Sequence, residues 1–225
     1  MKLAGKCPPE PGEMEAVNER GFDHVELMLR KEHLERFDDC LEAAKDADLN
    51  VASIHTPHVT LDEPIYFRKA DELAAELDAF LVVHSQYMHH VHIDRLEQQA
   101  DFQADYGYEN NPGASAYSLR NIILDQGHDL ALDTAHLFMA EENYLDELEV
   151  LLDSYPDRID VIHLCDSSPT EDGLGFGEGE MDMEQVCQVI DDSGFDGVLV
   201  FEVMPEHQEE AVRKWEKYTE QNQNP

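Results

Sequence analysis

The chain has 225 residues, which is long for one ordinary domain but normal for a single α/β barrel, so a sizeable core can form without a second domain. Fifteen Lys and Arg stand against fifty-one Asp and Glu, and the resulting net charge of −36 is spread along the whole sequence. Surfaces that bind nucleic acid or anionic membranes need clustered cations, which this sequence lacks, so the charge indicates instead a solvated acidic surface of the halophilic kind.

Four scattered cysteines, Cys7, Cys40, Cys165 and Cys187, form no CxxC pair, and this spacing favours reduced thiols over a disulfide framework. The N-terminal stretch MKLAGKCPPEPGE has no apolar run long enough for a signal peptide. No other stretch approaches the ~20 apolar residues that a membrane span needs. The sequence therefore predicts a soluble, cytoplasmic protein.

Short β-rich runs alternate with amphipathic helical segments along the chain. The eight predicted strands are Lys2–Lys6, His24–Leu29, Val51–His55, Phe80–His84, Tyr106–Glu109, Leu130–Asp133, Asp160–Leu164 and Gly197–Val203. Apolar residues recur at three- and four-residue intervals over 33–48, 69–80, 144–155 and 183–194, which predicts helices there. This alternation predicts a parallel sheet closed into a (β/α)8 TIM barrel, with a doubly wound open sheet as the alternative. Because no linker interrupts the pattern, we expect one domain over residues 1–225.

Side chains of metal-binding types stand at the C-terminal ends of six predicted strands: His55, His84, Glu109, Asp133, His163 and Glu202. In a barrel these strand ends form one ring at the mouth where active sites are built. The stretch LALDTAHLF adds His136, three residues after Asp133. Strand interiors rarely accept an unpartnered charge, so a shared cation would suit Glu109, Asp133 and Glu202 together.

Seven motifs make the sequence resemble a known family, and they occur in the order VASIHTPH, LVVHS, YGYENNPG, LALDTAHLF, VIHLCDSS, GFGEGEMD and LVFEVMP. They are similar to the xylose isomerase-like TIM barrel superfamily. This superfamily holds sugar and sugar-phosphate isomerases and epimerases, together with endonuclease IV-type nucleases that act at abasic sites (AP endonuclease family 2). The ordered set is specific to the superfamily and not to one reaction.

The resemblance implies roles for individual residues. In the single-metal epimerases that the chain resembles, one cation is held by four residues that match Glu109, Asp133, His163 and Glu202. His136 then contacts a substrate hydroxyl or, in the nuclease branch, a further metal. His55 and His84 match positions that hold additional zinc in the nuclease branch and line the substrate pocket in the isomerases, so we expect them to contact the substrate or the metal ligands.

Two departures from the superfamily patterns limit this transfer. The nuclease branch has a DxH pair of ligands before the GEG turn, and the aligned positions here are Glu171 and Gly173. Some ketose epimerases have a substrate-binding arginine six residues after the seventh-strand histidine, where this chain has Pro169. A trinuclear zinc site would thus lack a histidine, and the sugar contacts cannot be copied across.

The residue types suit proton transfer beside a carbonyl. A hydroxy-carbonyl sugar chelates a divalent ion, which stabilises the enediolate formed when a proton leaves the adjacent carbon. We expect Glu109 and Glu202 to be ligands that also transfer protons, Asp133 and His163 to be ligands only, and His136 to orient the substrate. The expected cofactor is one divalent ion, Mn²⁺, Mg²⁺ or Zn²⁺.

These expectations define a metal-dependent sugar or sugar-phosphate isomerase or epimerase. Three alternatives stay open: an abasic-site phosphodiesterase, an inosose-type polyol dehydratase, and a degenerate barrel that serves as a binding module. The expected partner is a small sugar or sugar phosphate. Nucleic acid is disfavoured by the scarcity of basic residues, no membrane is expected, and a homo-oligomer is left open.

Other polar stretches are assigned weaker roles. The cluster of His89, His90 and His92 is expected to lie in a solvated loop and not to form a second metal site. The glycine-rich stretch 173–180 fits a phosphate cradle and a flexible loop that leads into a helix equally well. Asp166 and Ser167 are expected to cap or line the mouth. Glu26, on the second strand, is a lesser candidate for the pocket.

Overall fold

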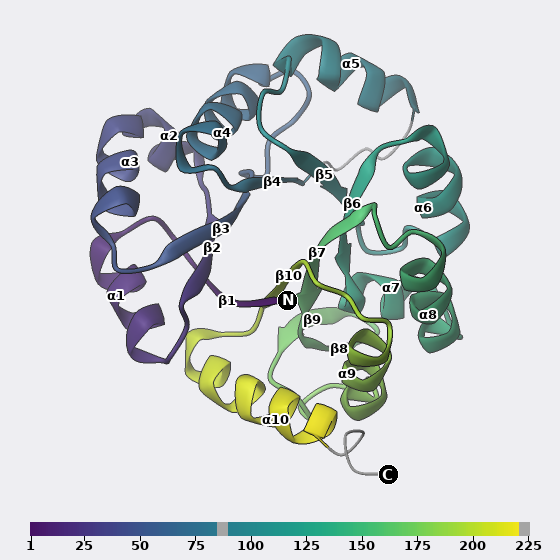
Figure 1. The fold of residues 1–225 in the computed structure, drawn as a ribbon. Helices are drawn as coiled ribbons and strands as arrows, with labels where there is room; N and C mark the ends of the chain where they lie inside the picture. Colours follow the sequence, from purple (N-terminus) through teal and green to yellow (C-terminus); the bar gives the residue numbers. More distant parts are fainter. Residues whose placement is uncertain (85–89, 221–225) are drawn as a thin grey trace.

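A closed barrel of parallel strands forms the centre of the computed structural model, which describes residues 1–84 and 90–220 (Figure 1). The strands are β1 (Lys2–Cys7), β2 (His24–Met28), β3 (Asn50–His55), β4 (Phe80–Val83), β5 (Tyr106–Glu109), β6 (Asp129–Asp133), β7 (Ile159–Leu164) and β10 (Val198–Phe201). Each strand pairs with its neighbour in this order, and β10 pairs back with β1. The predicted (β/α)8 barrel is confirmed, because this last pairing closes the sheet. The extent of one domain over 1–225 stays a prediction.

Helices surround the barrel and cover its outer face (Figure 1). They are α1 (Pro11–Glu19), α2 (Lys31–Glu35), α3 (Phe37–Asp46), α4 (Pro64–Leu77), α5 (His90–Ala100), α6 (Ala116–Ile122), α7 (Thr134–Ala140), α8 (Tyr144–Ser154), α9 (Met183–Asp192) and α10 (Gln208–Glu220), with the short 3₁₀ turns η1 (Leu124–Gln126) and η2 (Pro205–His207). The helix predicted over 33–48 is two helices, because Arg36 leaves the helical region with φ −110° and ψ 48°. The other three predicted helices are confirmed as α4, α8 and α9.

The barrel interior is built in layers, because alternate side chains of a strand point inward. Small apolar residues fill the lower layer: Ala4, Ala52, Val82, Ala131, Val161, Val198 and Val200. Two residues further along five of these strands stand Lys6, His84, Asp133, His163 and Glu202. A layer of ionisable side chains therefore lies directly above this apolar layer, at the C-terminal ends of the strands.

A two-stranded hairpin lies beside the mouth between β7 and α9, formed by β8 (Asp166–Ser168) and β9 (Glu171–Leu174). The buried carboxylate of Asp166 accepts hydrogen bonds from the backbone N–H groups of Gly177, Gly179 and Met181. Of the loop expected over 173–180, Gly173 and Leu174 belong to β9, and residues 175–180 form a turn that is held by Asp166 and leads to α9. A side chain at Gly179 would collide with that carboxylate, because a Cβ there would lie 2.4 Å from Asp166 Oδ1.

The histidine cluster is also ordered differently from the expected loop. Helix α5 begins at His90 and includes His92, so the loop prediction is wrong for these two positions, while His89 lies outside the described residues. Over the part of the chain that the structure describes, no helix has the length and apolar character needed to cross a bilayer. The expected cytoplasmic location stays a prediction.

The opposite end of the barrel carries an acidic group around Asp160 at the start of β7. Burial raises the pKa of Asp160 to about 6, and the nearby carboxylates of Asp129, Asp105 and Asp196 raise it further, against the effect of Arg158. The folded chain therefore holds a proton on Asp160 more tightly than the unfolded chain does. The stability that this proton contributes is fully present below the ordinary pKa of aspartate and is lost as the pH rises through about 6.

Replacing Asp160 with Asn should therefore stabilise the protein at neutral and alkaline pH. We expect the free energy of unfolding of Asp160→Asn to exceed that of the wild type by about 1 kcal/mol near pH ~8, after allowance for the partial exposure of this side chain, and to match it below pH ~4. Urea denaturation at both pH values measures the difference. Asp153→Asn, at an exposed site on α8, is the control and should show no such change. An equal gain at both pH values would contradict the explanation.

Candidate functional site

A pocket of about 460 Å³ opens where the barrel strands end. Its lining comes from distant parts of the chain and includes His55, His58, His84, Glu109, Asn111, Pro112, Asp133, His136, Cys165, Asp172, Gly173 and Glu202. A larger hollow of about 670 Å³ lies outside the barrel between α1 and α3, and the ionisable groups that line it are carboxylates. We take the pocket at the strand ends as the candidate site, because both carboxylates and imidazoles line it and its volume suits a small molecule.

Four residues meet at the floor of the pocket. Glu109, Asp133, His163 and Glu202 each offer one ligand atom, and these four atoms all lie within 4.8 Å of one another. Glu109 ends β5, Asp133 ends β6, His163 is the penultimate residue of β7, and Glu202 directly follows β10. The structure thus brings together the four residues that the sequence analysis expected to share a cation.

His163 stands at the centre of this group and is fully buried. Its Nδ1 atom lies 2.8 Å from Glu109 Oε1, 2.7 Å from Glu202 Oε2 and 4.0 Å from Asp133 Oδ2. A single N–H cannot serve three carboxylates, and its hydrogen bond goes to Glu109. Glu202 Oε2, although close, has no hydrogen-bond partner among the described residues.

A cation fits this arrangement. Three carboxylate oxygens and one imidazole nitrogen are a donor set suited to Mn²⁺, Mg²⁺ or Zn²⁺, and the unpartnered Glu202 Oε2 faces into it. His163 Nε2 lies 3.1 Å from Glu26 Oε2, so this nitrogen can donate to Glu26 while Nδ1 is left for an ion. Such support from a carboxylate is the usual arrangement behind a metal-binding histidine.

Lys6 and Glu26 lie beneath this group of four residues, and the sequence analysis did not predict their contacts. Lys6 was not considered and Glu26 was given only a lesser place, yet Lys6 Nζ lies 2.9 Å from Glu26 Oε1 and 2.7 Å from Glu202 Oε1. Ser53 donates a hydrogen bond of 2.8 Å to the other oxygen of Glu26. The signal was present, because Lys6 follows the small interior residue Ala4 by two positions, the same spacing that places Asp133 after Ala131.

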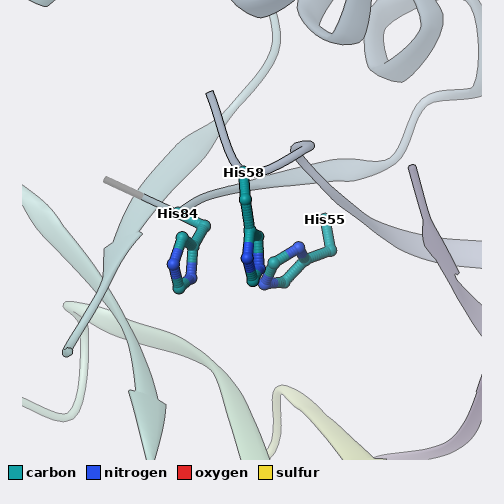
Figure 2. Close-up of side chains that lie close together, drawn as sticks. All are labelled: His55, His58 and His84. Carbon is teal, nitrogen blue, oxygen red and sulfur yellow. The ribbon is translucent and has the colours of Figure 1, made fainter. Parts of the chain in front are cut away.

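A second group of three imidazoles lies beside the first. Figure 2 shows the rings of His55, His58 and His84 reaching into the same space, and ligand atoms of the three lie within 4.8 Å of one another. The rings of His58 and His84 are stacked, 4.0 Å apart and inclined by 10°. Glu109 joins the two groups, because its Oε2 atom lies 2.9 Å from His55 Nε2 and 2.5 Å from His84 Nδ1. The sequence analysis missed His58, which follows the strand-end His55 by three positions.

His136 occupies the wall of the pocket. Its Nδ1 lies 2.6 Å from the carbonyl oxygen of Asn110 and its Nε2 lies 3.0 Å from Asp172 Oδ2. Both ring nitrogens therefore face acceptors. Burial acts to lower the pKa of His136, but Asp133 and Asp172 outweigh it and raise the pKa to about 9. His136 is thus held as a cation, and Asp172, on β9, is a pocket residue that the sequence analysis did not identify.

The floor carboxylates have contrasting environments. Burial acts to raise the pKa of Glu109, but His55 and hydrogen bonds from the surrounding imidazoles lower it well below its ordinary value. Burial likewise opposes the effect of Lys6 and His163 on Glu202, whose pKa is lowered to about 2. For Asp133 burial prevails and, with Glu202 and Glu109 nearby, raises the pKa to about 6. A bound divalent cation would favour the ionised form of all three.

The pKa of His58 is shifted in the opposite direction to that of His136. Burial together with His84 and His55 lowers the pKa of His58 to about 4, so its ring is neutral at ordinary pH. Burial also raises the pKa of the Cys165 thiol, and this thiol accepts a hydrogen bond from the backbone N–H of Gly173. Cys165 is therefore a protonated wall residue and an unsuitable nucleophile.

Solved structures similar to this fold include sugar epimerases. A D-tagatose 3-epimerase-like protein has 20% sequence identity, a TM-score of 0.73 and coverage of 99% of each chain. A D-allulose 3-epimerase from Methylomonas sp. has 13% identity and a TM-score of 0.73, covering 97% of this chain and 98% of its own. An L-ribulose 3-epimerase has 14% identity and a TM-score of 0.69, covering 99% and 96% respectively. At these identities the likeness shows the fold.

A search of the curated proteins finds no match. The family described as "Xylose isomerase-like TIM barrel" (AP endonuclease family 2) matches residues 14–222, which is nearly the whole chain and includes every residue of the two ligand groups. The resemblance inferred from the sequence motifs is therefore confirmed, and the chain belongs to the xylose isomerase-like TIM barrel family.

Proposed function

We propose that the protein is a divalent-metal-dependent sugar isomerase or epimerase. The observation that carries this proposal is the convergence of Glu109, Asp133, His163 and Glu202 at the floor of a pocket of about 460 Å³. The family and the similar epimerase structures support the same reaction class. The proposed ligands of the cation are these four residues.

When bound, the cation would stabilise the negative charge that develops on the oxygens of an enediolate. Glu109 and Glu202 both line the pocket, Glu109 at the end of β5 and Glu202 after β10, and β6 and β7 lie between these two strands in the sheet. We propose that one removes the proton from the carbon beside the carbonyl and that the other returns a proton. Glu202, with 30% of its side chain exposed, is the more accessible of the two.

His136 would orient the sugar from the pocket wall. Its charged ring is held by Asn110 at Nδ1 and by the more exposed Asp172 at Nε2. The Nε2–H group can therefore reach a substrate oxygen only if its contact with Asp172 is broken. We propose that a substrate hydroxyl or carbonyl takes the place of Asp172 at His136 Nε2. Asn110 keeps the other nitrogen in place, so the ring does not need to reorient.

The lining favours an uncharged sugar over a phosphorylated one. Among the described residues that line the pocket the charged groups are carboxylates and imidazoles, with no Lys or Arg to meet a phosphate. The same lining disfavours a phosphodiester. Isomerisation, epimerisation and inosose-type dehydration all begin with loss of a proton beside a carbonyl, so the lining suits all three.

Replacing Glu202 with Gln should abolish proton exchange at the reacting carbon. The substitution keeps the shape of the side chain but removes the base, so exchange of substrate hydrogen with deuterated water should fall by about 100-fold or more. NMR of ketoses incubated with the metal-loaded protein measures this exchange. Glu206→Gln, at an exposed position nearby, is the control. Wild-type rates of exchange in Glu202→Gln would refute the role of Glu202.

Metal titration of the ion-free protein should distinguish one site from two. We expect one Mn²⁺ ion per chain, an affinity that falls by at least about tenfold in Asp133→Asn, and an unchanged affinity in His58→Ala. Calorimetry measures both quantities. Binding of a second ion that is lost in His58→Ala would instead favour the hydrolase alternative, which cleavage of an abasic-site duplex would then test.

A further inference from the structure

Lys6 and His163 each contact the same two glutamates, so the four side chains form a closed ring. Lys6 Nζ contacts Glu26 Oε1 at 2.9 Å and Glu202 Oε1 at 2.7 Å, while His163 contacts Glu26 through Nε2 at 3.1 Å and Glu202 Oε2 through Nδ1 at 2.7 Å. Lys6 is 9% exposed and Glu26 is fully buried. Lys6 and Glu26 therefore lie below the pocket, shielded from water, and Glu202 joins them to the pocket lining.

The strand register places Lys6 in this ring. On one side β1 pairs with β2, and Lys6 lies directly opposite Glu26. On the other side β1 pairs with β10, and Ala4 lies opposite Val200. The next inward-facing residues of these two strands are Lys6 and Glu202. Lys6 thus stands between two carboxylates on its two neighbouring strands. Its position follows from the backbone and does not depend on a mobile loop.

The two oxygens of Glu202 are used differently. Oε1 accepts a hydrogen bond from Lys6, whereas Oε2 faces the ligand group and has no hydrogen-bond partner among the described residues. A carboxylate free at both oxygens can bind a cation through one or both of them. Lys6 leaves only Oε2 for the cation, because its ammonium group, a compact positive charge, is hydrogen-bonded to Oε1.

We propose that Lys6 is a positioning residue that restricts Glu202 to one oxygen toward the cation and so keeps a coordination position free for the sugar. This inference rests on the proposed metal-dependent function. A glutamate that bound the ion through both oxygens would take a position that the substrate needs. Lys6 acts through Glu202 and need not touch the substrate.

The ring also has an electrostatic consequence. Three ligand carboxylates and Glu26 surround the site, and a divalent ion offsets only part of their charge. Lys6 supplies a fixed positive charge on the floor, on the side away from the pocket. The developing negative charge of an enediolate would therefore meet less repulsion than the carboxylates alone would produce.

The test uses Mn²⁺, because exchangeable water on this ion enhances the relaxation of solvent protons. An octahedral ion held by four single atoms keeps two positions for water, and a second oxygen of Glu202 would take one of them. In Lys6→Met, which keeps the length of the side chain and removes its charge, we expect the relaxivity of bound Mn²⁺ to fall about twofold. We also expect kcat to fall at least about tenfold with a smaller change in KM.

A second variant guards against loss of folding. Lys6→Met leaves Glu26 and Glu202 without their shared cation, so Lys6→Met combined with Glu26→Gln restores the net charge of the ring and still releases Glu202 Oε1. The double variant should show the same loss of relaxivity. Lys2→Met, on the same strand at the opposite end of the barrel, is the matched control and should behave as the wild type does. Thermal unfolding verifies that each variant is folded.

The outcomes separate this inference from the proposed function. Lower relaxivity in both Lys6 variants supports the role of Lys6 even if the wild type turns over no ketose, in which case the proposed reaction alone fails. Unchanged relaxivity in the folded double variant overturns the inference, whether or not activity is lost. A wild-type protein that does not bind Mn²⁺ overturns it as well.

Discussion

Three carboxylates share the floor of one pocket with the buried ring of His163, and one of their oxygens, Glu202 Oε2, has no hydrogen-bond partner among the described residues. Glu109 and Asp133 are each 2% exposed, so neither can rely on water to offset its charge. His55, His84 and His163 contact Glu109, Lys6 and His163 contact Glu202, and burial prevails at Asp133. A divalent cation would satisfy all three carboxylates at once.

The barrel makes this concentration of charge tolerable. The layer below the floor consists of small apolar residues such as Ala4, Val82 and Val161, which pack the interior without polar atoms. Glu26 and Lys6 lie between that layer and the pocket, and they tie the strand-end residues to the fixed backbone of β1 and β2. The ligands are therefore held by strands, which position side chains more precisely than loops do.

The group of His55, His58 and His84 adds imidazole nitrogens to a pocket whose floor consists mainly of carboxylates. The ring of His58 is neutral at ordinary pH and stacks on that of His84, while His55 and His84 both contact Glu109. The opposite wall carries the cationic His136 and Asp172. Under the proposed function, a sugar would meet imidazole nitrogens from one group and the charged ring of His136 from the other, and this asymmetry would orient its hydroxyl groups.

The sequence determined the architecture and the identity of the four floor residues. Period-two strands alternate with amphipathic helices, and a strand-end residue is recognisable because the apolar run stops there, as at Glu109 and Asp133. Boundaries shifted by a few residues, and one predicted helix divided at Arg36. The halophilic and cytoplasmic setting that the composition indicates stays a prediction.

Only the tertiary structure decided which charges are neighbours. The strand pattern places Lys6 and Glu26 on inward-facing positions, but it does not show which charges they contact, and His58 and Asp172 lie outside the predicted strands. Their roles arise from closure of the barrel, which sets Lys6 between β2 and β10, and from the hairpin β8–β9, which brings Asp172 to His136. Local sequence specifies the period of an element, whereas contacts between residues as far apart as 6 and 202 depend on strand register and on the closing of the sheet.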